Sequence, residues 1–134
     1  MVAHSLYNAP MIYKTPLGDE VTSTHYESVR DTFLVDCQSI VTEHMKSFGW
    51  ECILSIAKGR RYDKIVKADM HRPDNPSHSV YGFIDKTNGN ILKAESWRKP
   101  AKNPRGNIYE DDRMLFMSPY GPAYMDSIKS YYGA

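Results

Sequence analysis

The strongest turn signal in the chain is Asn88-Gly89, which lies between two segments with the composition of β-strands. Residues 78–85 and 90–95 are rich in aromatic and aliphatic side chains, and both turn residues accept the positive φ of a tight hairpin. The sequence therefore predicts an antiparallel β-hairpin over residues 78–95. We expect the rest of the chain to be organised around this hairpin.

Two further strands are predicted before the hairpin. Residues 52–57 form a short apolar run with β-branched side chains, which favours a strand over a second helix. Residues 61–69 alternate in character, as a half-exposed strand does, and residues 58–60 form the turn between the two. Because four strands follow one another within residues 51–95, the simplest arrangement is an antiparallel meander.

A long amphipathic helix is predicted over residues 24–48. Thr24 and Glu27 have the spacing of a capping box, and Gly49 is a natural terminator. The predicted buried stripe consists of Val29, Phe33, Cys37, Ile40, Val41, His44, Met45 and Phe48. The predicted solvated face consists of Glu27, Arg30, Asp31, Gln38, Glu43 and Lys46. This helix would cover one face of the meander and give an α+β fold.

The remaining segments complete a single domain of 134 residues, a length sufficient to bury a core. Residues 1–22 contain two prolines and a glycine, which predicts an extended arm with at most one short strand, near residues 11–14. Pro122 suits the first turn of a short C-terminal helix over residues 122–132.

The composition predicts a protein that does not enter a membrane. Hydrophobic residues make up 41% of the chain and charged residues 25%, and no apolar run is long enough to cross a bilayer. The N-terminus has neither the cationic start nor the apolar segment of a signal peptide. We therefore expect a cytoplasmic location, with the two cysteines as free thiols.

Charge is distributed unevenly along the chain, although the net charge is only +1. Residues 58–105 contain 12 Lys/Arg and 5 Asp/Glu, a balance of +7, whereas the remainder contains 5 and 11, a balance of −6. A basic middle between acidic flanks favours either an anionic partner or pairing of the two regions, within one chain or between copies.

The basic segment 96–107 supplies the candidate site. Its two prolines exclude a helix interior or a central strand and favour an extended, polyproline-like path. A polyproline II helix has about three residues per turn, so Lys99, Lys102 and Arg105 would lie along one edge. Cations beside an aromatic side chain are typical of a groove that binds single-stranded nucleic acid or another phosphorylated ligand. The candidate binding residues are Trp97, Arg98, Lys99, Lys102 and Arg105, extended by Lys58, Arg60 and Arg61.

Three other interpretations stay open at this point. An ordered loop would place Trp97 against the edge of the core and leave the cations in solvent. Tyr81 and Phe83 have the spacing of base-stacking aromatics in an RNA-recognition strand, but two such residues on one strand face more often indicate burial. In an interaction module, the acidic flanks would pair with the basic middle of a neighbouring copy, or the chain would bind a host protein.

No motif for catalysis, a metal or a cofactor is legible. His71 and His78 bracket a loop with acidic residues, but their spacing matches no standard zinc or calcium pattern. The acidic segment 110–112 fits a solvated turn better than a magnesium site. Because P-loop, dinucleotide-binding and Ser-His-Asp patterns are also lacking, the sequence favours a non-enzymatic protein without a cofactor.

Several segments resemble a group of small proteins encoded by tailed bacteriophages. The shared segments are YGFID (81–85), NGNILKA (88–94), SW (96–97), PAK (100–102), RGNI (105–108) and YGPAY (120–124). The resemblance covers residues 58–124, with departures at Arg98-Lys99 and Asn103-Pro104. It implies a viral origin and expression in the host bacterial cytoplasm, as either a virion component or a host-takeover factor. The resemblance transfers no catalytic or binding residue.

Overall fold

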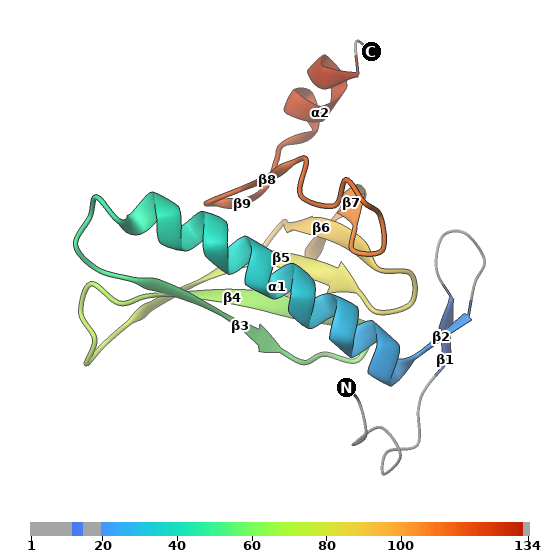
Figure 1. Ribbon diagram of the computed structural model, residues 1–134, viewed down its shortest axis with the longest axis horizontal. Coiled ribbons are helices and arrows are strands. Elements are labelled where there is room, and N and C mark those ends of the chain that lie inside the picture. Colours follow the sequence, from blue (N-terminus) through green and yellow to red (C-terminus); the bar gives the residue numbers. More distant parts are fainter. Residues whose placement is uncertain (1–11, 15–19, 133–134) are drawn as a thin grey trace.

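The computed structural model describes the backbone of residues 12–14 and 20–132, and the side chains from residue 25 to residue 132. Within these residues the chain has an α+β fold, which confirms the predicted fold class (Figure 1). A long helix, α1 (Ser23–Met45), and a short helix, α2 (Met125–Tyr131), accompany a five-stranded antiparallel sheet. The strands of this sheet are β3 (Cys52–Ala57), β4 (Tyr62–Asp69), β5 (Ser77–Asp85), β6 (Asn90–Ala94) and β7 (Pro100–Asn107).

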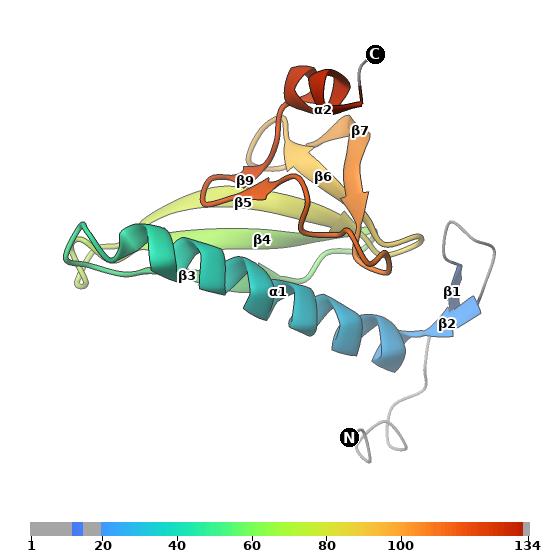
Figure 2. The same ribbon diagram turned by 45° about the horizontal axis from the view of Figure 1, so that its top comes forward.

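The sheet has the order β3-β4-β5-β6-β7, in which each strand pairs antiparallel with the next strand in sequence. This is the predicted meander, extended by one strand. The small hairpin of β8 (Met117–Ser118) and β9 (Gly121–Pro122) lies beside α1 and contacts β5 and β6 (Figures 1 and 2). Helix α1 and this hairpin therefore share one face of the sheet.

The predicted N-terminal arm falls largely outside the described residues. Where the backbone is described, β1 (Ile12–Lys14) pairs antiparallel with β2 (Glu20–Thr22). The sequence predicts at most one strand in this segment, so β2 is an additional strand. The reason is that three-residue strands are too short for an alternating pattern to be recognised.

The segment assigned above to a polyproline-like path is the edge strand β7. It pairs with β6 from Pro100, opposite Ala94, to Asn107, opposite Asn90, with two register shifts between them. The polyproline prediction is wrong because an edge strand needs hydrogen bonds on one side only and therefore tolerates proline. Strand geometry also separates the cations, since Lys102 is exposed whereas Arg105 is buried.

The β5–β6 turn differs in detail from the predicted hairpin turn. Gly89 has a φ of +81°, but Asn88 does not adopt positive φ. The carbonyl of Asp85 accepts hydrogen bonds from the N–H groups of Gly89 (2.7 Å) and Asn88 (3.4 Å), so the loop spans residues 86–89. A Cβ on Gly89 would also lie 2.5 Å from the ring of Tyr109. The position therefore requires glycine for two independent reasons.

Helix α1 packs the central part of its predicted stripe against the sheet. Phe33, Cys37 and Val41 are buried in the core. The helix ends at Met45, three residues before the predicted end, and Phe48 is 45% exposed. The predicted stripe is therefore buried in the middle of the helix, whereas its last residue, Phe48, lies beyond the helix and is partly exposed.

Two further details of the helix prediction change. Helix α1 begins at Ser23, before the predicted cap residue Thr24, whose side chain lies outside those described. His44, expected in the core, is half-buried, and its Nε2 lies 3.1 Å from the hydroxyl of Tyr120. His44 thus has Tyr120 as its partner, a residue that follows β8. No local sequence pattern indicates this pairing.

A buried ion pair joins α1 to the start of β4. Asp63 is fully buried and accepts hydrogen bonds from the hydroxyl of Tyr26 (2.8 Å) and the guanidinium of Arg30 (3.0 Å). The N–H of Gly59 (3.3 Å) and the ammonium group of Lys86 (4.0 Å) approach the same carboxylate. The prediction that Arg30 is solvated is therefore wrong. Burial and the Asp63 carboxylate raise the pKa of Tyr26, so its hydroxyl stays a donor.

Gln38 protects the outer edge of the sheet. Its Nε2 donates to the carbonyl of Cys52 (2.9 Å), and its Oε1 accepts from the N–H of Leu54 (2.7 Å). The side-chain amide takes the place of a neighbouring strand along β3, which is the other edge strand. The prediction that Gln38 is solvated is also wrong, because its partners lie on a strand that the helix pattern does not include.

A β-bulge places Tyr81 and Phe83 on opposite faces of β5. The pairing between β4 and β5 shifts register in mid-strand. The Tyr81 hydroxyl donates to the carbonyl of Ser118 in β8 (2.6 Å), whereas the Phe83 ring packs against the Tyr62 ring, with centroids 6.3 Å apart. The prediction of one shared face is wrong because the alternation breaks at the bulge. Both aromatics are buried, so neither offers its ring to a nucleic-acid base.

The C-terminal helix is shorter than predicted. Pro122 belongs to β9 rather than to the first turn of a helix, and α2 contains no buried residue. Neither α1 nor α2, the two described helices, is long and apolar enough to cross a membrane.

Candidate polyanion-binding cleft

A cleft of about 570 Å³ opens on the sheet face that points away from α1. Asp63 and Ile91 are buried on the α1 side of the sheet. Their neighbours in sequence, Tyr62 and Leu92, line the cleft. Neighbouring residues of a strand face opposite ways, so Tyr62 and Leu92 point away from α1. The lining of this basic cleft consists of Arg61, Tyr62, Asp85, Asn88, Asn90, Leu92, Arg98, Lys99, Pro100, Ala101, Lys102 and Pro104.

The strand register brings the parts of the cleft together. Tyr62 pairs with Asp85 across β4 and β5, and Leu92 pairs with Pro104 across β6 and β7. The sheet therefore forms the floor, while the β5–β6 turn and the β6–β7 connection form the walls. In Figure 2, β6 and β7 turn away from α1 and run toward α2.

Four cations line the cleft, although they are separated in sequence. Arg61 precedes β4, whereas Arg98, Lys99 and Lys102 belong to the β6–β7 connection and β7. The sequence analysis named all four as candidate binding residues. Their convergence depends on the meander, which places the start of β4 and the connection to β7 on the same side.

Acidic neighbours offset part of this positive charge. The guanidinium of Arg61 lies 3.2 Å from the Asp85 carboxylate, and the ammonium group of Lys99 lies 3.1 Å from that of Glu95. Both side chains of the Lys99–Glu95 pair are exposed, so solvent screens that pair strongly. The other two lining cations form no ion pair among the described residues. The cleft therefore keeps an excess of positive charge.

Trp97 lies beside the cleft rather than in its lining. The turn that carries it is closed by hydrogen bonds from the N–H groups of Glu95 (2.8 Å) and Ser96 (3.0 Å) to the carbonyl of Lys99. The Nζ of Lys64 lies 4.1 Å from the indole centroid, and Trp97 is 47% exposed. A cation thus covers part of the ring, and about half of the side chain is open to solvent.

Arg105 does not reach the cleft. It is buried, with its Nε donating to the carbonyl of Ala123 (3.2 Å) and a terminal nitrogen donating to the carbonyl of Asn103. Burial lowers the pKa of this guanidinium. Arg105 ties β7 to the segment that follows β9. Its inclusion among the candidate residues rested on the three-residue repeat of a polyproline helix, which β7 does not form.

Lys58 and Arg60 are exposed in the β3–β4 turn and do not line the cleft. The turn is held in place by the Nζ of Lys86, which donates to the carbonyl of Gly59 (3.0 Å). These two cations adjoin Arg61 in sequence. They therefore add positive charge near the cleft without contributing to its walls.

The sequence analysis missed Asn88 and Asn90, which also line the cleft. Asn88 Oδ1 accepts a hydrogen bond from the N–H of Asn90 (2.8 Å), an arrangement typical of asparagine beside a turn. The turn composition explains both residues by itself, so no sequence signal separates a turn former from a side chain that faces a ligand. The register of β6 against β7 supplies that information.

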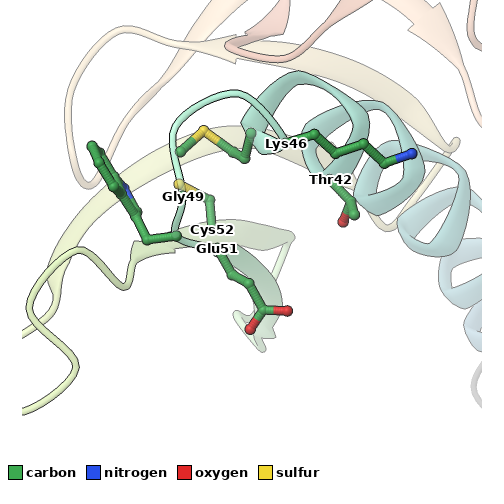
Figure 3. Close-up of a pocket in the computed structure, with 7 residues that line it drawn as sticks. Thr42, Lys46, Gly49, Glu51 and Cys52 are labelled. Carbon is green, nitrogen blue, oxygen red and sulfur yellow. The ribbon is translucent and has the colours of Figure 1, made fainter.

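A second, smaller hollow lies between the end of α1 and the start of β3, where Figure 3 labels Thr42, Lys46 and Cys52. Its volume of about 220 Å³ is below the roughly 300–1,000 Å³ of most small-molecule sites. Lys46, the one cation among its described lining residues, already pairs with Glu43 at 3.3 Å. The hollow therefore lacks the charge that a polyanion requires.

The residues considered for a metal lie elsewhere in the structure. Among the described residues, no three His, Cys, Asp or Glu side chains gather as a metal site requires. His71 packs against the ring of Trp50, with centroids 4.1 Å apart. Cys37 and Cys52 are buried free thiols, and burial raises the pKa of Cys37 to about 12.

The fold and the cleft define a small α+β protein with a cation-lined cleft on an antiparallel sheet. The chain belongs to a family of unknown function, DUF7717, whose model matches residues 12–119. No curated protein and no solved structure matches the chain. The matched residues include all five strands of the large sheet and the whole lining of the cleft.

Proposed function

We propose that this protein binds single-stranded nucleic acid or another phosphorylated ligand through the basic cleft, as a non-enzymatic accessory protein. The observation that supports this most is the convergence of Arg61 with Arg98, Lys99 and Lys102 on one cleft. Contacts from Lys and Arg to phosphate supply most of the affinity of non-specific nucleic-acid binding.

The size and surroundings of the cleft favour a single strand over a duplex. A cleft of about 570 Å³ holds a nucleotide-sized group but not the width of a double helix. The exposed part of Trp97 lies next to the cleft, where it offers a stacking surface to the base of an adjacent nucleotide. An extended strand would thus place one unit in the cleft and the next on the indole.

Fluorescence polarisation of a labelled single-stranded oligonucleotide, titrated at low and at near-physiological salt, tests the proposal. Binding should fall log-linearly with salt. The variant Arg98→Gln/Lys99→Gln/Lys102→Gln should bind more weakly, with a salt slope lower by about 2, since each phosphate contact on a single strand contributes roughly 0.7. A lack of binding at low salt would overturn the proposal.

A matched control separates the cleft from net charge. The exposed cations Lys46, Arg72 and Lys129 lie outside the lining of the basic cleft. Their combined replacement by Gln removes the same charge as the cleft variant. It should leave affinity within about twofold, because distant charges act only through a screened field. Equal losses in the two variants would mean that overall charge, and not the cleft, binds the oligonucleotide.

We further propose that the protein is encoded by a tailed bacteriophage and acts in the host bacterial cytoplasm. The support is the resemblance of the segments YGFID, NGNILKA, SW, PAK, RGNI and YGPAY to such proteins. The genes that flank its coding sequence test this origin. Flanking genes of ordinary chromosomal metabolism, with no viral genes nearby, would contradict it.

A second candidate function is an interaction module that forms a homo-oligomer or binds a host protein. It is favoured by Tyr124, Tyr131 and Tyr132, each at least 62% exposed, on and beside helix α2, which buries none of its residues. Light scattering in moderate salt would give a mass above that of one chain if these aromatics join copies. A monomer at all concentrations would exclude self-association through this surface.

A further inference from the structure

We propose that the basic cleft discriminates between pyrimidines and prefers thymine or uracil over cytosine. This inference rests on the proposed function, because it concerns the base of a nucleotide bound in that cleft. It is carried by the direction in which two lining amides, Asn88 and Asn90, are fixed by hydrogen bonds to the rest of the fold.

The orientation of Asn90 follows from a chain of hydrogen bonds that begins at the backbone. The Oδ1 of Asn107 accepts from the N–H of Tyr109 (2.9 Å), so the Nδ2 of Asn107 is directed to the other side. There it donates to the carbonyl of Asn88 (2.8 Å) and to the Oδ1 of Asn90 (3.0 Å). Because Asn90 must present its oxygen to this donor, its Nδ2 is left for the cleft.

The amide of Asn88 is oriented in the same way, and the carboxylate of Asp85 already accepts hydrogen bonds from within the protein. The Oδ1 of Asn88 accepts from the N–H of Asn90 (2.8 Å), which leaves its Nδ2 as a donor. Asp85 Oδ1 accepts from the N–H (2.9 Å) and hydroxyl (2.6 Å) of Thr87, and Asp85 Oδ2 accepts from Arg61 (3.2 Å). The polar side chains of the cleft therefore offer mainly donors.

The two kinds of pyrimidine differ at positions 3 and 4, and a donor-rich wall that contacts position 4 distinguishes them there. Thymine and uracil carry a carbonyl oxygen at position 4, which accepts a hydrogen bond from an amide N–H. Cytosine carries an amino group there, and this donor would face the donors of Asn88 and Asn90. An amino group that leaves water without gaining an acceptor costs binding free energy. Cytosine should therefore bind more weakly.

The test compares homopolymeric deoxythymidine and deoxycytidine oligonucleotides of equal length by fluorescence polarisation at one salt concentration. The wild-type protein should bind deoxythymidine about fivefold more tightly, the value of roughly one hydrogen bond. In Asn90→Asp the retained oxygen still accepts from Asn107, while an acceptor replaces the donor toward the cleft. The ratio should fall to about one or reverse, because the amino group of cytosine then gains a partner.

Asn75→Asp is the matched control, since Asn75 is exposed in the β4–β5 loop and does not line the basic cleft. It adds the same charge and should preserve the wild-type ratio. Asn88→Asp repeats the test at the other amide and keeps it decisive if Asn90→Asp fails to fold. Equal salt-dependent binding of both homopolymers by the wild type overturns the preference and leaves the proposed function intact. No binding of either overturns both.

Discussion

The two faces of the five-stranded sheet use charged side chains in opposite ways. Under α1, the carboxylate of Asp63 is fully buried and is satisfied by Arg30 and Tyr26. On the other face, Arg61 pairs with Asp85 from a largely exposed position, and further cations of the cleft lack ion-pair partners among the described residues. A buried charge must be paired for the fold to be stable, whereas a solvated charge remains free for a ligand.

Position relative to the sheet, rather than residue type, therefore separates structural from binding charges in this protein. Arg105 makes the point within one strand. It belongs to the same basic segment as Lys102, but it is buried and bonded to the carbonyl of Ala123. The two faces should therefore respond differently when their charged and buried side chains are replaced.

The largest effect is expected for Phe33→Ala, on the α1 face. Phe33 is completely buried in the core beneath the helix. Its truncation should lower the free energy of unfolding by roughly 3–5 kcal/mol, because it loses apolar burial and leaves a cavity. Chemical denaturation measures the change. A loss well under 1 kcal/mol would mean that α1 does not hold the core as the structure indicates.

The next largest effect should come from Asp63→Asn, which removes one charge of the buried pair. Arg30 would then lose its buried anionic partner and keep only Asp31, which is largely exposed, so we expect a loss of about 3 kcal/mol in denaturant unfolding. Asp85→Asn is its counterpart on the cleft face. It should cost about 1 kcal/mol, since Arg61 can return to water and the Asn oxygen still accepts from Thr87. Equal losses would show that the ion pairs on the two faces contribute equally to stability.

The buried ion pair of Asp63 also shows which features of the fold can be predicted from the sequence. The hairpin, the two preceding strands and the long helix were predictable because each is a local pattern of alternation or of three- and four-residue spacing. The pairing of Asp63 with Arg30 was not, since it joins a strand to a helix across the core and each residue has the local pattern of an exposed charge. Long-range ion pairs leave no local signature.

The candidate site was predictable to the extent that charge composition marks a polyanion site. Lys99 and Lys102 were recognised from their segment, and Arg61 from its adjoining basic turn. The roles of Arg105 and Asn90 depend instead on the pairing of residues 100–107 with β6, whereas the prolines favoured a polyproline-like path. Strand register decides which side chains of a basic segment face a ligand, and register is a property of the folded sheet.

Alkaline pH should destabilise the α1 face, where the buried Cys37 interacts with Tyr81 and where Tyr26 is also buried. Burial raises the pKa of the Cys37 thiol from 9.0 to about 12, and burial also raises the pKa values of Tyr26 and Tyr81. Above pH 9 the unfolded chain releases protons that the folded chain keeps, so stability falls as pH rises toward 12. Cys37 alone should contribute about 1 kcal/mol of this loss between pH 8 and pH 10.

Urea unfolding at a series of pH values measures this dependence, and Cys37→Ala is the control. The variant lacks the thiol, so its stability should fall less steeply between pH 9 and pH 10, whatever its stability at neutral pH. An identical slope in both proteins would show that the thiol ionises as readily in the folded chain as in the unfolded one.

The smallest effect on stability is expected where the effect on binding should be greatest. Arg98→Gln/Lys99→Gln/Lys102→Gln removes three cations, of which only Lys99 has an ion-pair partner among the described residues, the exposed Glu95. The free energy of unfolding should change by less than about 0.5 kcal/mol, because exposed charges contribute little and the removal also relieves mutual repulsion. Arg105→Gln, by contrast, should cost about 2 kcal/mol, since it breaks buried hydrogen bonds. Denaturant unfolding of the two variants under the same conditions measures both changes. If the triple variant loses more unfolding free energy than Arg105→Gln, the cleft cations stabilise the β6–β7 connection. The sheet would then not have one structural face and one binding face.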